Sequence, residues 1–273
     1  MKRLGSPLLV HLVLVLLAAF SLFPLLWMVS VSLMHAGEAS AYPPPLLPAS
    51  PTLENYRELF TRSGIARTLG NSLLLATAAT LLSLLFNVGA GYAFARLPFP
   101  GRERIFRVLV LSLVIPGQVA MLPLFLLLKS MGLVNSYGGV LVPALASIFG
   151  IFLVREYART IPEELLEAAR IEGAGELRIF FSIVLPLLRP ILVTLAVFTF
   201  LASWNDFMWP LIILTDQHLQ TLPVALAGLS REHVQDNELM MAGAVLTVLP
   251  PLVLFLALQR YYLRGLLLGS IKG

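Results

Sequence analysis

Acidic and basic side chains are concentrated between residues 163 and 178, in a chain whose flanking stretches are strongly apolar. Glu163, Glu167 and Arg170 are spaced four and three residues apart. At that spacing they share one face of a helix, where they can form ion pairs with one another or with a second protein. A polar helix between two membrane-length apolar runs indicates a contact made outside the membrane.

A second candidate for polar chemistry is Asp206, the only acid inside an apolar run long enough to cross a membrane. Together with Trp204 and Asn205, it can stack on a sugar and form hydrogen bonds with it. The same three residues also fit the kinked interfacial end of a span, and both interpretations stay open. Asn87 and Gln118, in two other apolar runs, are further candidates for lining a pathway.

Other kinds of site have no sequence signal. The four histidines, His11, His35, His218 and His233, form no metal or triad pattern with the acids. There is no cysteine, which excludes disulfides and thiolate metal sites. A Gly-x-x-x-x-Gly-Lys-Ser/Thr phosphate loop is also absent from the sequence, so we expect no cofactor in this chain and no ATP hydrolysis by it alone.

The composition is that of an integral membrane protein, with 58% hydrophobic and 12% charged residues among 273. Spans need about 20 predominantly apolar residues. The apolar runs predict an all-α protein with six spans in a single domain, at about residues 8–33, 68–95, 106–129, 136–156, 190–214 and 239–261. The first run is too long for the core of a secretory signal, so we expect an uncleaved span.

The positive-inside rule orients these six spans. With both termini in the cytoplasm, the inner segments hold 14 Lys and Arg residues and the outer segments hold 5. The net charge of +4 therefore reflects orientation and indicates no nucleic-acid partner. This topology places residues 158–189 in the cytoplasm and residues 215–238 outside.

The cytoplasmic loop 158–189 reads as an ordered elbow. Thr160 and Glu163 fit a capping box, and Gly173 fits a left-handed helix end, so we expect a helix from Glu163 to Gly173. A second short helix is expected from Glu176 to about Leu185. A helix that lies on the lipid headgroups is the alternative that periodicity leaves open.

The loop also carries a motif. Glu167-Ala168-Ala169, Gly173-Ala174, Phe180, Ile183, Leu185-Pro186 and Pro190 resemble the EAA motif of binding-protein-dependent ABC importers, with Glu172 where the family commonly has Asp. Further similarity follows at GYAFARLPFPGR (91–102), MLPLFLLLKSMGLVNSY (121–137), FLASWNDFMWPLI (200–212) and the C-terminal QRYYLRGLLLGSIKG. Nearly the whole chain resembles the carbohydrate-type, MalG-like permease subunits.

The resemblance implies a type I ABC importer permease fold in a bacterial or archaeal cytoplasmic membrane. It implies a second, MalF-like permease subunit, an ATPase dimer that binds ATP and Mg²⁺, and an extracytoplasmic sugar-binding protein, for which residues 215–238 are the natural surface. It makes the EAA helix a coupling helix, with ATPase-docking residues Glu163, Glu164, Glu167, Ala168, Ala169, Arg170, Glu172, Gly173 and Ala174.

Two points remain open under this resemblance. The tail residues Ser270, Lys272 and Gly273 are candidates for a second ATPase contact, with a frayed terminus as the alternative. A di- or oligosaccharide is favoured, then a monosaccharide, with glycerol phosphate behind, because no Lys or Arg lies in the interior of a span to meet a phosphate. A secondary transporter or channel that works without ATP is the alternative function, and it leaves the cytoplasmic elbow without a role.

Overall fold

The computed structural model describes residues 7–61, 63–232 and 236–270, and these residues form helices and connecting turns with no β-strand. The chain divides into two compact units. The first contains residues 1–67 and 222–250, and the second contains residues 68–221 and 251–273.

The first unit contains α1 (Pro7–Ser32), a 3-10 turn (Glu38–Ser40), α2 (Glu54–Thr61), α13 (Leu222–Glu232) and the first part of α14 (Asn237–Ser270). Helix α2 is held by Asn55, which is buried and donates from Nδ2 to the carbonyl oxygens of Ser32 and Met34 at 3.0 and 2.8 Å. The start of α14 is tied to the 3-10 turn, because Glu238 accepts a 2.7 Å hydrogen bond from the backbone N–H of Ala39.

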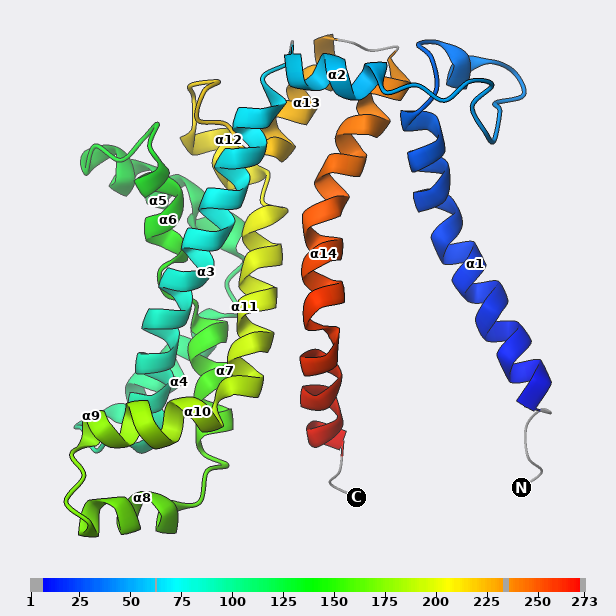
Figure 1. Cartoon of the computed structure of the whole chain (residues 1–273). Helices are drawn as coiled ribbons and strands as arrows, with labels where there is room; N and C mark the ends of the chain where they lie inside the picture. Colours follow the sequence, from blue (N-terminus) through cyan, green and yellow to red (C-terminus); the bar gives the residue numbers. More distant parts are fainter. Residues whose placement is uncertain (1–6, 62, 233–235, 271–273) are drawn as a thin grey trace. The chain divides into compact units, whose positions relative to one another are not determined.

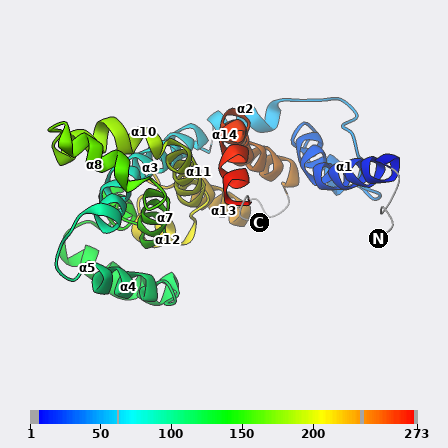
Figure 2. The same cartoon turned by 90° about the horizontal axis from the view of Figure 1, so that it is seen from below.

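The second unit is the larger one. Its helices are α3 (Ile65–Arg96, which begins in the first unit), α4 (Arg102–Ser112), α5 (Gly117–Ser130), α6 (Tyr137–Ala144), α7 (Ile148–Ala158), α8 (Glu163–Ile171), α9 (Glu176–Ile179), α10 (Leu185–Leu187), α11 (Arg189–Trp204) and α12 (Met208–Ile213). A π-helical turn, Phe180–Val184, joins α9 to α10. Helices α3, α7 and α11 run side by side, and α8 lies at the end of the unit beyond α9 and α10 (Figures 1 and 2).

Glycines let α3 approach α7 closely. A Cβ atom at Gly91 would lie 2.6 Å from Cβ of Val154, and one at Gly150 would lie 2.5 Å from Nδ2 of Asn87. Real side chains do not tolerate such distances, so both positions need glycine for this packing. The core beside this contact continues to the segment that holds α8 and α9 through the buried residues Val88, Tyr92, Val154, Ala158, Ile161, Leu166, Ala169, Ile179, Val184, Leu188 and Leu195.

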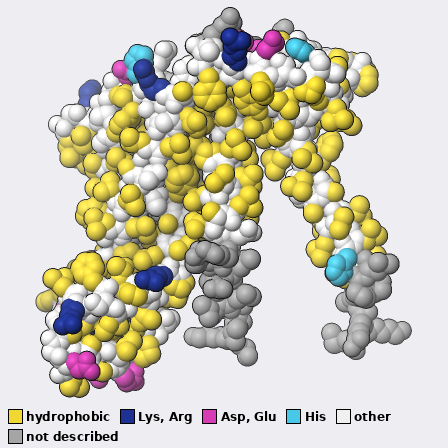
Figure 3. All heavy atoms as spheres, viewed as in Figure 1, with side chains coloured by type: hydrophobic (Ala, Val, Ile, Leu, Met, Phe, Trp, Pro, Cys, Tyr) yellow, Lys and Arg dark blue, Asp and Glu magenta, His cyan; other side chains and the backbone are white. Residues whose placement is uncertain are grey.

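Four of the described helical segments are long and apolar enough to cross a bilayer: Leu9–Ser32, Ile65–Arg96, Tyr137–Ala158 and Asn237–Gln259. Two bent pairs raise the number to six if each pair forms one span. They are α4 with α5, bent by 105°, and Glu176–Leu187 with α11, bent by 75°. On the face shown in Figure 3, hydrophobic side chains cover most of the second unit, and charged side chains gather toward its two ends.

Candidate functional site

The predicted elbow between residues 158 and 189 is present, and its first helix, α8, runs from Glu163 to Ile171. The predicted capping box is wrong. Pro162 occupies the N-cap position, and the Thr160 hydroxyl donates to the carbonyl oxygen of Tyr157 at 2.8 Å instead. Pro162 is extended, with ψ of 134°, so the helix begins after it and Thr160 lies too far back to reach its free N–H groups.

The end of α8 has the predicted left-handed glycine. Gly173 has φ of +83°, its N–H donates to the carbonyl oxygen of Arg170 at 2.9 Å, and the N–H of Ala174 donates to that of Ala169 at 3.0 Å. These two bonds make a Schellman motif, which satisfies carbonyl groups that the end of a helix leaves free. The chain therefore turns sharply at Gly173 in a fixed direction.

The two faces of α8 have different surroundings. Leu166 is fully buried and Ala169 nearly so, and both belong to the core that joins α8 to α3, α7 and α9. Ile171 is 87% exposed, and Glu167 and Ala168 are exposed beside it. The helix is thus fastened through one face and presents a mixed apolar and acidic surface on the other.

Arg96, at the end of α3, holds the corner that precedes α8. Its guanidinium donates to the carbonyl oxygens of Ala158 (3.1 Å), Arg159 (3.2 Å) and Ile161, and it also pairs with Glu163. Ala158 is the last residue of α7, so Arg96 supplies donors to carbonyl groups that the helix end leaves free, and its positive charge suits that end. One side chain therefore fixes the end of α7 relative to the first residue of α8.

Arg170 joins the two helices of the elbow through ion pairs. Its Nε donates to Oε1 of Glu176 at 2.7 Å, and Nη1 lies 3.5 Å from Oε1 of Glu163. The hydrogen bond with Glu176 raises the pKa of the Arg170 guanidinium above its usual value. Glu176 also accepts from the Tyr92 hydroxyl at 3.4 Å. Arg170 thus connects the starts of α8 and α9, which gives it a structural role within the loop.

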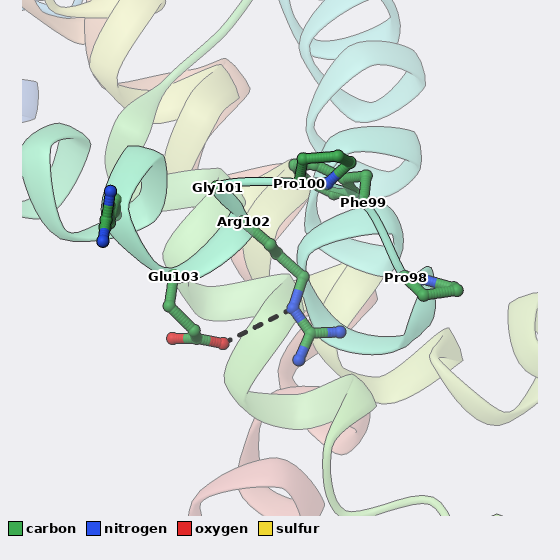
Figure 4. Close-up of a pocket in the computed structure, with 7 residues that line it drawn as sticks. Pro98, Phe99, Pro100, Gly101, Arg102 and Glu103 are labelled. Atoms are coloured by element: carbon green, nitrogen blue, oxygen red, sulfur yellow. Dashed lines mark ion pairs between the residues drawn. The ribbon is translucent and has the colours of Figure 1, made fainter.

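A second clamp joins α7 to the start of α4. Arg155 is buried, and its Nη2 lies 2.9 Å from both carboxylate oxygens of Glu103. Its guanidinium also lies over the Phe106 ring, 3.9 Å from the centroid. Glu103 lies in the first turn of α4 and lines an open hollow together with the turn that joins α3 to α4, and it also pairs with Arg102 at 3.5 Å (Figure 4). Together with Arg96, this clamp fixes the end of α3, the start of α4 and the end of α7 relative to one another.

Gly173 provides a prediction for this loop. A Cβ atom at Gly173 would meet nothing within 4 Å, so Gly173→Val should act only through the left-handed backbone, at a cost of about 1–2 kcal/mol. We expect the variant to insert normally but to bind the ATPase more weakly, measured by co-purification. Gly175→Val is the matched control, because Gly175 also has open space but an ordinary φ of −72°. Equal ATPase recovery from both variants would contradict the prediction that the left-handed backbone at Gly173 is needed for ATPase binding.

The candidates for the membrane pathway lie in different environments. Asp206 lines a cavity of about 410 Å³ in the second unit. Trp204 is buried, whereas Asn205 and Gln118 are exposed and do not line this cavity. Asn87 is buried behind the cavity wall, where it donates to the Ser83 hydroxyl at 2.6 Å and accepts from the Ser147 N–H at 2.9 Å. The structure thus brings Asp206 to a cavity and gives Asn87 a supporting position.

The candidate tail residues lie at the end of α14 or beyond it. Ser270 is the last residue of α14, while Lys272 and Gly273 lie outside the described residues, as does His233. Within the described residues, no group of three or more His, Cys, Asp or Glu is arranged to hold a metal.

Four residues of these sites were not predicted from the sequence: Arg96, Arg155, Thr199 and Ser203, the last two with hydroxyls that line the cavity. For the hydroxyls the signal was present, since their four-residue spacing puts them on one helix face.

Comparison with known proteins identifies the family. Residues 87–267 match the family described as "Binding-protein-dependent transport system inner membrane component". The arabinooligosaccharides transport system permease protein AraQ of Halalkalibacterium halodurans is 39% identical, and the alignment covers 100% of both chains. The melibiose/raffinose/stachyose import permease protein MelC of Bacillus subtilis is 34% identical over 99% of both.

Two further comparisons bear on substrate and fold. The sn-glycerol-3-phosphate transport system permease protein UgpE of Escherichia coli is 34% identical over 94% of both chains. A chain from the crystal structure of a bacterial ABC transporter involved in the import of alginate shares the fold, with a TM-score of 0.84 and 20% identity, over 96% of this chain and 100% of that one. Since the matched region spans more than half of the sequence, the chain belongs to the family of binding-protein-dependent transport system inner membrane components.

Proposed function

We propose that this chain is a membrane-spanning subunit of an ATP-driven sugar importer. It pairs with a second, MalF-like permease subunit to form the translocation pathway, and an extracytoplasmic sugar-binding protein delivers the substrate. ATP and Mg²⁺ bind to a partner ATPase dimer, which supplies the energy. A di- or oligosaccharide is the favoured substrate, as the names of AraQ and MelC relatives also suggest.

The proposed topology has six spans and both termini in the cytoplasm. The bent pairs α4 with α5 and α9–α10 with α11 then contribute the third and fifth spans. Each break lies at a residue that disfavours a continuous helix, Pro116 before α5 and Pro190 at the start of α11. This arrangement puts α8 on the cytoplasmic side, where an ATPase can reach it.

The observation that supports ATP coupling best is the fixed presentation of α8. Leu166 anchors the helix, Arg96 and Arg170 fix its two ends, and Ile171 leaves an apolar side chain facing outward. A helix that only rested on lipid headgroups would need none of these restraints on its direction. A rigid helix with an exposed face can transmit the motion of a docked partner to α3, α7 and α11, against which its core packs.

Reconstitution tests this function directly. The complete importer, with its second permease subunit, ATPase and binding protein, is placed in vesicles and offered arabinotriose, raffinose, lactose or glycerol 3-phosphate. We expect uptake of at least one of the three sugars, and only when ATP and the binding protein are both present. Uptake that persists without the ATPase would support the alternative, a secondary transporter or channel. Uptake of glycerol 3-phosphate alone would overturn the sugar assignment.

A further inference from the structure

The cavity beside Asp206 has the chemistry of a sugar-binding site. Its volume of about 410 Å³ lies within the ~300–1,000 Å³ typical of small-molecule pockets. All of its walls belong to the second unit, and it is lined by Ala79, Ser83, Val140, Ala144, Ser147, Phe149, Leu195, Phe198, Thr199, Ala202, Ser203 and Asp206. Apart from Asp206, none of these residues was singled out by the sequence.

Two helix breaks meet at this cavity. The helical segment Tyr137–Ala158 is interrupted between Ala144 and Ile148. At this break the N–H of Ser147 donates to Oδ1 of Asn87 at 2.9 Å. Helix α11 ends at Trp204, and Asp206 accepts a hydrogen bond from the N–H of Trp209 at 3.3 Å. Irregular backbone is tolerated at membrane depth where it lines a polar cavity or is buried in protein. The breaks therefore mark the cavity as a polar place within the membrane region.

Helix α11 presents one continuous face to the cavity. Its lining residues are Leu195, Phe198, Thr199, Ala202 and Ser203, which follow the three- and four-residue spacing of a helix face. Within the described part of the chain, the hydroxyls of Thr199 and Ser203 have no hydrogen-bonding partner. Thr194, on the same helix but outside the cavity lining, instead donates back to the carbonyl oxygen of Pro190 at 3.1 Å. The two cavity hydroxyls are thus available to a ligand.

The cavity also offers apolar surface. Phe149 and Phe198 face each other edge to face with ring centroids 6.5 Å apart, and both are about half exposed. No Lys or Arg lines the cavity, and its one charged side chain is the carboxylate of Asp206. Hydroxyls and a carboxylate can bond sugar hydroxyls, and aromatic rings can cover the apolar faces of sugar rings. An anionic group would meet no positive charge here.

We propose that this subunit binds uncharged sugar rings in this cavity during transport. Asp206, Thr199 and Ser203 hydrogen-bond the sugar hydroxyls, and Phe149 and Phe198 contact its apolar face. The inference rests on the proposed function and deepens it, since it gives this chain a direct part in substrate choice. It favours neutral sugars over phosphate-bearing solutes, which the UgpE relative by its name transports.

The first test uses the absence of cysteine from the chain. Thr199→Cys and Ser203→Cys are introduced singly, and each complete importer is treated in vesicles with a water-soluble methanethiosulfonate reagent. We expect both thiols to react, and the sugar that the wild-type importer takes up to slow the reaction about tenfold by occupying the cavity. Val197→Cys is the control, because Val197 lies on α11 outside the cavity lining, and its labelling should not respond to sugar. Sugar-independent labelling at both cavity positions would overturn the proposal.

The second test measures transport. Thr199→Val removes one hydroxyl at nearly constant shape and should lower sugar uptake about tenfold, while ATP hydrolysis stimulated by the binding protein persists. Thr199→Ser should restore uptake. Val197→Thr, the reverse exchange away from the cavity, should transport normally. Asp206→Asn should lower uptake similarly, but Asp206 also accepts a hydrogen bond from the Trp209 N–H in α12, so Thr199 is the cleaner test. Normal uptake by Thr199→Val would contradict the site. If the wild-type importer takes up no sugar, the proposed function fails first.

Discussion

Replacement of Arg96 by glutamine is expected to lower ATP-driven sugar uptake at least about tenfold while the protein still inserts in the membrane. The Arg96 side chain is only 12% exposed, and it satisfies carbonyl groups at the end of α7 while pairing with Glu163 at the start of α8. Glutamine keeps one donor group but loses the charge and the forked geometry. The substitution should destabilise the corner between α7 and α8 by about 2 kcal/mol. Helix α8 should then lose its fixed direction.

The comparison for Arg96 is Arg102→Gln. Arg102 is the first residue of α4 and contacts the Leu97 carbonyl oxygen and Glu103, but it makes no contact with α8. Uptake and ATP hydrolysis should be measured together in vesicles that hold the complete importer. We expect Arg96→Gln to impair both and Arg102→Gln to impair neither. If the two variants behave alike, Arg96 does not position the coupling helix.

Ile171→Asp is expected to weaken binding of the ATPase about tenfold or more. Ile171 projects from α8 and is 87% exposed, so the substitution should leave the fold of this subunit intact. In a docked complex the same position would be buried, and a carboxylate there would lose its hydration without gaining a partner. Recovery of the ATPase with affinity-purified permease measures the effect.

Leu47→Asp is the matched control for Ile171→Asp. Leu47 is a similarly exposed apolar residue, 76% accessible, in the segment between the first two predicted spans, which the predicted topology puts on the side opposite to the cytoplasm. The subunit with Leu47→Asp should bind the ATPase as well as the wild type does. Undiminished ATPase recovery with Ile171→Asp would place the docking surface elsewhere on the cytoplasmic face.

The sequence predicted the local features of the elbow well. The left-handed conformation of Gly173 follows from a short-range rule for helix ends, and the helix expected from Glu163 is present although its predicted N-cap was wrong. The role of Arg96 could not be predicted in this way, because its contacts with Ala158 and Glu163 join residues more than sixty positions apart. Thr160 was misassigned because Pro162 delays the start of the helix, a competition that residue types alone do not decide.

The residues that line the membrane pathway were harder to predict from the sequence. Asp206 stood out because an acid within a span is rare, but Asn87 and Trp204 proved to be buried in packing. Thr199 and Ser203 were overlooked because hydroxyls are common in membrane helices, where most bond to their own backbone. Only the three-dimensional arrangement shows that the break after Ala144 and the end of α11 meet the same cavity.

The most direct test of the account is photo-cross-linking from Ala168, an exposed residue of α8 in a chain without natural cysteine. Ala168→Cys is labelled with a benzophenone maleimide in membranes that contain the complete importer, and the products are resolved by mass. The account predicts a covalent product between this subunit and the ATPase, which is absent from the Leu47→Cys control. No ATPase product from position 168, in membranes where the ATPase still co-purifies with the permease, would contradict the account.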